Sequence, residues 1–130
     1  MGLKQQQVGK SFEKEILQYY ADKGYWTYKF PTEFGGTICD IMVVKNSATM
    51  FIEAKHITGT KLYYKGCGIY KKRDELDNFV SKYNCNIYIM IKSDELGYYW
   101  TTWLRSKEVF EKQGHLDLQK DCFKASLEVR

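Results

Sequence analysis

The residues best suited to chemistry are Asp40, Glu53 and Lys55, which lie in the largely apolar segment 37–55. Carboxylate oxygens bind hard divalent cations, and a lysine beside such a cation can orient a water or neutralise growing negative charge. A charged trio within an apolar segment costs free energy unless the charges are paired or bind something. These residue types therefore indicate metal-assisted hydrolysis of an anionic substrate.

This segment is expected to form a β-hairpin with its turn at residues 45–48. Counting back in the register that this turn sets places Asp40 opposite Glu53, with their Cβ atoms about 5 Å apart. Lys55 follows two residues after Glu53 and so lies on the same face. Two facing carboxylates repel each other, and a divalent cation between them converts the repulsion into binding. Both faces of the hairpin are largely apolar, which favours a central hairpin covered on both sides.

A third acidic candidate, Glu13, lies in an N-terminal amphipathic helix whose apolar residues in segment 8–20 share one arc. Gly24 is expected to end this helix. Glu13 falls inside the apolar arc, whereas Glu15 falls just outside it and is expected to face solvent. Glu13 therefore either lies at the edge of the buried stripe or points toward the reactive face of the hairpin.

The rest of the chain alternates short apolar runs with amphipathic segments. The pattern predicts strands at 24–30, 86–91 and 98–103, helices at 71–83 and 104–113, loops at 31–37 and 56–70, and a turn at 93–97. Residues 115–130 have a mixed pattern that predicts no single element. This order implies an α/β fold in which helices flank one mixed central sheet, within a single domain spanning residues 1–130.

Composition sets outer bounds on the function. The chain has 130 residues, of which 44% are hydrophobic, as in a globular protein. Its net charge of +4 is compatible with a polyanionic partner without requiring one. The four cysteines are scattered without a C-x-x-C pair, which argues against a zinc module. No segment has the apolar run of a signal peptide or membrane span, so an intracellular, cytoplasmic protein with no membrane partner is expected.

Lysines and tyrosines alternate just after the acidic residues. Lysines can contact phosphates and tyrosines can stack on bases, although a charged run is often only a solvated surface. The candidate DNA-contacting residues are Lys61, Tyr63, Tyr64, Lys65, Lys71, Lys72 and Arg73. Lys4 and Lys10 are candidates for the same surface.

An acidic residue on one strand followed by Glu-x-Lys on the next resembles the PD-(D/E)xK nuclease superfamily. Here the pattern is Asp40 followed by Glu53, Ala54 and Lys55, and the order of elements over roughly residues 9–103 resembles the restriction-endonuclease-like core of that superfamily. The closest likeness is to Holliday-junction resolvases of the archaeal and RecU types. It rests on GKSFEKEI at 9–16, which is similar to their opening helix, and on FIEAK at 51–55, which is similar to their second motif. The chain departs from the pattern at Cys39, where the superfamily name has proline, and in having no glutamine at 71–75.

The resemblance implies a structure-specific endodeoxyribonuclease that depends on Mg²⁺ or Mn²⁺ and acts on a four-way junction. Asp40, Glu53, the Ala54 carbonyl and Glu13 would bind metal, and Lys55 would orient or deprotonate the attacking water. Two symmetric cuts in a junction favour a homodimer. Two alternatives stay open: a restriction or repair nuclease acting on duplex or flap DNA, and a non-catalytic nucleic-acid-binding protein with the same fold.

Overall fold

The computed structural model describes residues 2–31 and 38–127, with side chains described from residue 11 onward. The expected loop at 31–37 therefore lies almost entirely outside the described residues, as do the side chains of Lys4 and Lys10. None of the described helices is both long and apolar enough to cross a membrane.

A mixed six-stranded sheet forms the centre of the structure, in the order β1-β2-β3-β5-β6-β8. Strands β3 and β5 are parallel, and the other neighbouring pairs are antiparallel. The strands are β1 (Trp26–Lys29), β2 (Ile41–Lys45), β3 (Ala48–Ile57), β5 (Ile87–Ser93), β6 (Gly97–Thr102) and β8 (Phe123–Lys124). The mixed sheet predicted from the sequence is confirmed.

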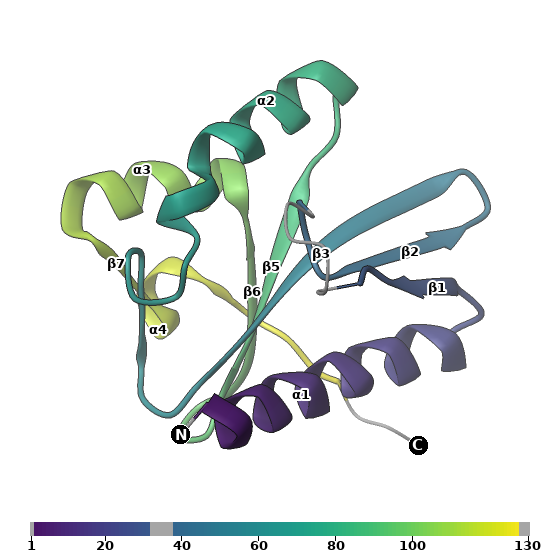
Figure 1. Ribbon diagram of the computed structural model, residues 1–130, viewed down its shortest axis with the longest axis horizontal. Helices are drawn as coiled ribbons and strands as arrows, with labels where there is room; N and C mark the ends of the chain where they lie inside the picture. Colours follow the sequence, from purple (N-terminus) through teal and green to yellow (C-terminus); the bar gives the residue numbers. More distant parts are fainter. Residues whose placement is uncertain (1, 32–37, 128–130) are drawn as a thin grey trace.

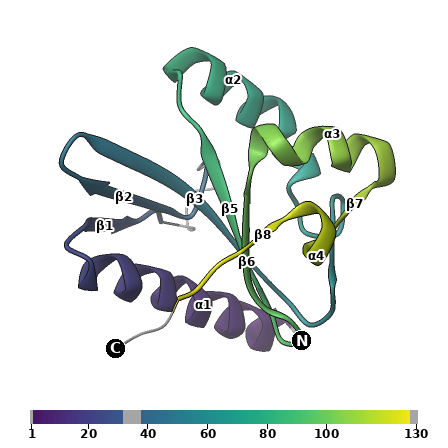
Figure 2. The same cartoon turned by 180° about the vertical axis from the view of Figure 1, so that it is seen from behind.

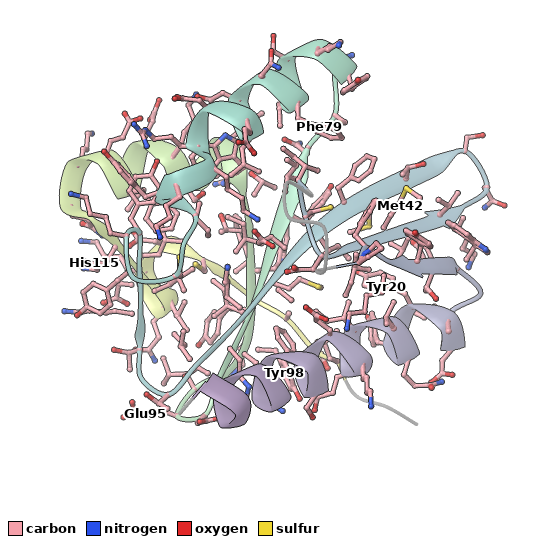
Figure 3. The ribbon with its side chains drawn as sticks, viewed as in Figure 1. Tyr20, Met42, Phe79, Glu95, Tyr98 and His115 are labelled. Carbon is pink, nitrogen blue, oxygen red and sulfur yellow. The ribbon has the colours of Figure 1, made fainter. Side chains whose placement is uncertain are left out.

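Helices cover both faces of this sheet (Figures 1 and 2). Helix α1 (Gly2–Asp22) lies along one face, and α2 (Arg73–Tyr83) and α3 (Trp103–Gln113) lie over the other. Gly24 follows α1 with a φ of +87°, a conformation that glycine adopts without steric cost, which explains why the helix ends there. Side chains on the two faces are separated in the same way: Figure 3 shows Tyr20 on the α1 side and Phe79 of α2 on the other.

Each face has its own hydrophobic core. On the α1 side, Phe12 and Ile16 pack against Ile41, Val43 and Ile52 of the hairpin. On the other side, α2, α3 and the loops beside them cover the alternate residues of the central strands. The fully or nearly fully buried members there include Leu62, Ile69, Leu76, Ile87, Ile89, Ile91, Trp103, Phe110 and Leu116. Because β5 is covered on both faces, nearly all of its residues are apolar.

The register predicted for the hairpin is confirmed. Val44 pairs with Thr49, and Asn46 in the turn has a φ of +56°, in the left-handed region that Asn tolerates. The expectation that both faces are covered holds on the α1 side. On the opposite side Met42 and Val44 stay half-buried, because α2 reaches only the β3 edge of the hairpin, where Phe79 contacts Phe51.

The segment expected to be a loop at 56–70 contains regular structure. Strand β3 continues to Ile57, and β4 (Lys61–Tyr63) pairs with β7 (His115–Asp117) in a second, two-stranded sheet. Only Leu62 of β4 is buried, opposite Leu116, and a three-residue alternation of this kind is too short to distinguish a strand from a loop. After β7, helix α4 (Leu118–Asp121) and β8 complete the chain.

The other predicted elements are present with shifted ends. The strand predicted at 24–30 is shorter, and the helix predicted at 71–83 begins with a 3₁₀ turn, η1 (Tyr70–Lys72). Helix α3 ends where predicted: Gly114 has a φ of +78° and its N–H bonds to the Phe110 carbonyl.

Replacing Ile52 by alanine should lower the free energy of unfolding by about 2–5 kcal/mol, because Ile52 has no exposed surface and fills the space between α1 and the hairpin. Urea denaturation followed by circular dichroism measures the loss. Glu108→Ala, on the exposed side of α3, is the control and should stay within about 0.5 kcal/mol of the unmodified protein. Equal losses in the two variants would contradict this account of the core.

Candidate active site

Asp40 and Glu53 come together at the open end of the hairpin. Asp40 directly precedes β2, and its N–H donates to the Ile52 carbonyl at 3.0 Å. Its Oδ2 accepts the N–H of Ala54 at 2.8 Å, which fixes the carboxylate beside the middle of β3. Since Ile41 pairs with Ile52, the next pair outward is Asp40 with Glu53, as the sequence predicted.

The Glu53 carboxylate is almost completely buried, with 3% of its side chain exposed. Burial, followed by the neighbouring Asp40 carboxylate, raises the pKa of Glu53 from 4.5 to about 7, while Lys55 and Lys72 act in the opposite direction. The thiol of Cys39 lies in the same surroundings, and burial together with the two carboxylates raises its pKa to about 12. The acidic pair therefore lies in a weakly solvated site where added negative charge is unfavourable and a cation is favoured.

The lysine that pairs with Glu53 comes from a different element than the sequence suggested. Lys72, at the end of η1, places its ammonium against Glu53 Oε2. Lys55 instead donates to the Cys67 carbonyl at 2.8 Å. Among the ion pairs of the described residues, none joins Lys55 to Asp40 or Glu53, so the simple surface ion pair is not what positions Lys55.

Glu13 is buried, as its place in the apolar arc predicted, but it lies on the other face of the sheet. Its Oε2 is 3.0 Å from the ammonium of Lys29. Lys29 pairs with Ile41, which belongs to the core on the α1 side, and paired residues share a face. Lys29 and its partner Glu13 therefore lie on the α1 side. Glu53 points to the α2 side, because it follows Ile52, which faces α1. The structure therefore does not bring Glu13 to the other two carboxylates.

Glu15, expected in solvent, is half-buried and accepts hydrogen bonds from Lys92 and Tyr98.

The donors expected for a cation are the carboxylates of Asp40 and Glu53, which the structure brings together, and the Ala54 carbonyl, which the resemblance implies. Within residues 11–31 and 38–127, no group of three or more acidic, histidine or cysteine side chains converges closely enough to hold a metal. Mg²⁺ commonly uses only one or two carboxylates and keeps several waters, so the Asp40 and Glu53 pair with the Ala54 carbonyl fits its requirements. Glu53 Oε2 is also buried without a well-aligned hydrogen bond, and the group that lies against it is itself a cation, the Lys72 ammonium.

The candidate DNA-contacting residues separate into exposed and engaged groups. Lys61, Tyr63, Lys65 and Lys71 are exposed. Tyr64 is buried and stacks on Phe110 with ring centroids 4.4 Å apart, so it belongs to the core and is not free to stack on a base. Lys72 is bound to Glu53, and Arg73 donates to the Tyr70 carbonyl at 2.8 Å while lying over the Tyr70 ring.

Two participants in this region were not predicted from the sequence. Cys67 acts through its backbone carbonyl, which every residue type carries, so its identity gave no indication of the contact with Lys55. Lys29 could have been suspected, because it alternates with the exposed residues Trp26 and Tyr28 and so points inward. A partly buried lysine on a short strand is stabilised by an acidic partner, and Glu13 supplies it.

Comparison with known proteins agrees with this geometry. The sequence model of the archaeal Holliday junction resolvase (hjc) family matches residues 4–121 of this chain. The chain belongs to the archaeal Holliday junction resolvase family. Among solved structures, it is similar to Hjc of Archaeoglobus fulgidus, a Holliday junction resolvase from an archaeal hyperthermophile. The two share 16% sequence identity and a TM-score of 0.53, over 75% of each chain.

At this identity the likeness to the Archaeoglobus resolvase shows a shared fold, and membership of the resolvase family rests on the match over residues 4–121. The match includes α1, the hairpin with Asp40 and Glu53, and the crossover with Lys72. A search of curated proteins gave no match.

In metal-free protein, Glu53 should make stability fall as the pH rises from about 4.5 to about 7. Folding raises the pKa of Glu53 from 4.5 to about 7, so between these pH values the folded state holds more protons than the unfolded state. The resulting stabilisation is fully present below about pH 4.5 and is lost as the pH rises through about 7. At about 1.4 kcal/mol per pKa unit, the loss is up to about 3 kcal/mol. Urea denaturation in EDTA at about pH 5 and about pH 8 should show this loss relative to Glu53→Gln, which has no group that titrates there.

The matched control for the pH experiment is Glu75→Gln, which changes an exposed carboxylate on α2 and should follow the unmodified protein at both pH values. If the Glu53→Gln profile ran parallel to that of the unmodified protein, Glu53 would not hold a proton in the folded state.

Proposed function

We propose that this chain is a metal-dependent endodeoxyribonuclease that cuts four-way DNA junctions. The observation that carries the proposal is the pairing of Asp40 with Glu53 across β2 and β3, next to Lys55, in a chain of the archaeal Holliday junction resolvase family. A protein that only binds DNA has no use for two adjacent carboxylates, because they repel the phosphate backbone unless a cation neutralises them.

Asp40, Glu53 and the Ala54 carbonyl would hold Mg²⁺ or Mn²⁺. A bound ion of this kind supplies a water of lowered pKa and neutralises charge on the phosphate. Asp40 is preorganised for the task, because the Ala54 N–H holds one of its oxygens and leaves the other available. Glu53 is preorganised by burial within the sheet, which fixes its rotamer and excludes competing water.

Lys55 would act on the phosphate side of the reaction. It is half-buried, its ammonium is held by the Cys67 carbonyl, and within residues 11–31 and 38–127 no ion pair joins it to a carboxylate. A charge of this kind can orient a water or stabilise the negative charge that develops on the phosphate oxygens in the transition state. The loop that carries Cys67 also carries the exposed Lys65, so the same segment joins the site to the surface offered to DNA.

The substrate would be branched and the enzyme a homodimer. Resolving a four-way junction requires two cuts at symmetric positions, and each chain offers one pair of carboxylates on the α2 side of its sheet. A two-fold dimer supplies two such sites in the orientation that a symmetric junction needs.

Asp40→Asn should abolish cleavage of a four-way junction in Mg²⁺ or Mn²⁺, that is, lower the cleavage rate more than about a hundredfold. Junction binding should stay intact. The change removes a metal ligand but adds no repulsion toward phosphate. Cleavage is measured on labelled junction, flap, duplex and single-stranded DNA, with EDTA as the metal-free reference, and binding by a mobility shift in EDTA.

Asp74→Asn is the control, since Asp74 is an exposed carboxylate in the first turn of α2, and it should cut normally. Absence of cleavage of every substrate by the unmodified protein would rule out the nuclease. Equal cleavage of all four substrates would rule out only the preference for junctions. Normal cutting by Asp40→Asn would mean that the site lies elsewhere.

The double variant Lys61→Gln and Lys65→Gln should weaken junction binding and reduce its salt dependence. Both lysines are exposed, Lys61 on β4 and Lys65 in the loop that follows it, and each phosphate contact contributes about 0.9 to the slope of log affinity against log salt concentration. The slope should therefore decrease by roughly 2, as measured by fluorescence anisotropy over a salt series.

Lys23→Gln, at the far end of α1, removes an exposed positive charge away from the site and should leave the slope unchanged. A decrease of the same size in both proteins would indicate a general charge effect and not a contact surface around β4.

A further inference from the structure

The position of Lys72 is the feature that the proposed mechanism does not use. Its ammonium lies against Glu53 Oε2, an oxygen with no well-aligned hydrogen bond. The same oxygen belongs to the carboxylate assigned to the metal. An ammonium and a divalent cation repel each other, and both take carboxylate oxygens, so they compete for Glu53.

The backbone around Lys72 is fixed, whereas its side chain has a route outward. Ile69, just before η1, is fully buried, the Lys72 N–H bonds to its carbonyl at 3.1 Å, and the Tyr70 N–H bonds to the Tyr64 carbonyl at 3.2 Å. The Lys72 side chain is 23% exposed, against 3% for that of Glu53. The flexible lysine can therefore leave toward solvent, while the carboxylate stays in place.

The charges at the site give the exchange its direction. Two neighbouring carboxylates, one of them buried, need compensation by positive charge, and in the metal-free protein the single charge of Lys72 provides part of it. A divalent cation brings twice that charge and can contact both carboxylates. Lys55 also compensates Glu53, since its charge lowers the pKa of that carboxyl, but its ammonium is held by the Cys67 carbonyl, and of the two lysines only Lys72 is paired with a Glu53 oxygen.

We propose that Lys72 occupies the position of the metal on Glu53 in the metal-free protein, that a divalent cation displaces it, and that the released ammonium then contacts a phosphate of the DNA. The proposal rests on the metal site of the proposed function. It makes Lys72 a positioning residue that holds the site in a neutralised state until metal arrives. It also couples metal binding to DNA binding, since one event supplies both the cation and a free lysine beside it.

The first test is calorimetric titration of Ca²⁺ into the DNA-free protein, because Ca²⁺ takes the same oxygen ligands. Lys72→Met removes the competing charge and should bind Ca²⁺ at least about fivefold more tightly than the unmodified protein, the lower end of the range for coupled ligands. Lys71→Met changes the exposed neighbour in the same 3₁₀ turn and should bind Ca²⁺ like the unmodified protein. Unchanged or weaker binding by Lys72→Met would overturn the proposal.

A second measurement uses the unmodified protein and so does not depend on whether a variant folds. An amine-reactive acetylating reagent is applied with and without saturating Ca²⁺, and each lysine is quantified by peptide mass spectrometry. Acetylation of Lys72 should rise several-fold in Ca²⁺ while that of Lys71 stays constant. Equal acetylation of Lys72 in both conditions would overturn the displacement.

The coupling to DNA is read from junction affinity in Ca²⁺ and in EDTA. Ca²⁺ should increase the affinity of the unmodified protein more than that of Lys72→Met, and an equal increase would overturn the final step. Failure of the proposed function has a different signature: the unmodified protein would neither bind Ca²⁺ or Mn²⁺ nor cut DNA, and the role of Lys72 would fall with it. Metal binding and cleavage by the unmodified protein, with no effect of Lys72→Met, would remove the Lys72 inference alone.

Discussion

The structure around the site depends on compensating the charge of one buried carboxylate. Glu53 lies in the middle of β3, between strands on both sides and beneath η1, and a second carboxylate, Asp40, is held next to it by the Ala54 N–H. Burying such a pair without a counter-charge is strongly unfavourable. The contact of Lys72 with Glu53 and the raised pKa of Glu53 both reflect that constraint.

The two faces of the sheet carry different kinds of residue. The α1 face is a conventional core, in which Glu13 and Lys29 form an ion pair at the margin of packed aliphatic side chains. The opposite face carries the carboxylates and receives the crossover between β3 and β5, which includes η1 and α2. The strict alternation of side chains along β2 and β3 therefore separates residues that support the fold from residues available for chemistry.

Much of this arrangement could be predicted from the sequence, because it follows from local pattern. The turn at 45–48 and the apolar alternation on either side determine the register, and the register places Asp40 beside Glu53. Burial of Glu13 could also be predicted from helical periodicity, but its face of the sheet could not, since that depends on which side α1 packs. The partners of the two lysines could not be predicted for a similar reason. Lys72 contacts Glu53 through a tertiary contact, and Lys55 contacts a backbone carbonyl, which every residue type carries. The short strands β4, β7 and β8 are formed by pairing between distant segments, and their own residues show little preference for them.

The parallel pairing of β3 with β5 has a consequence for the folding of the chain. The hairpin and α1 involve neighbours in the sequence, whereas joining β3 to β5 requires closure of the whole crossover, which delays this contact during folding. The carboxylates can therefore lie side by side early, but the lysine of η1 and the carbonyl that holds Lys55 reach them only when the crossover docks. A partly folded chain would have the acidic pair without Lys72 against Glu53 and without the carbonyl that holds Lys55. The complete set of charged groups around Asp40 and Glu53 thus requires the completed sheet.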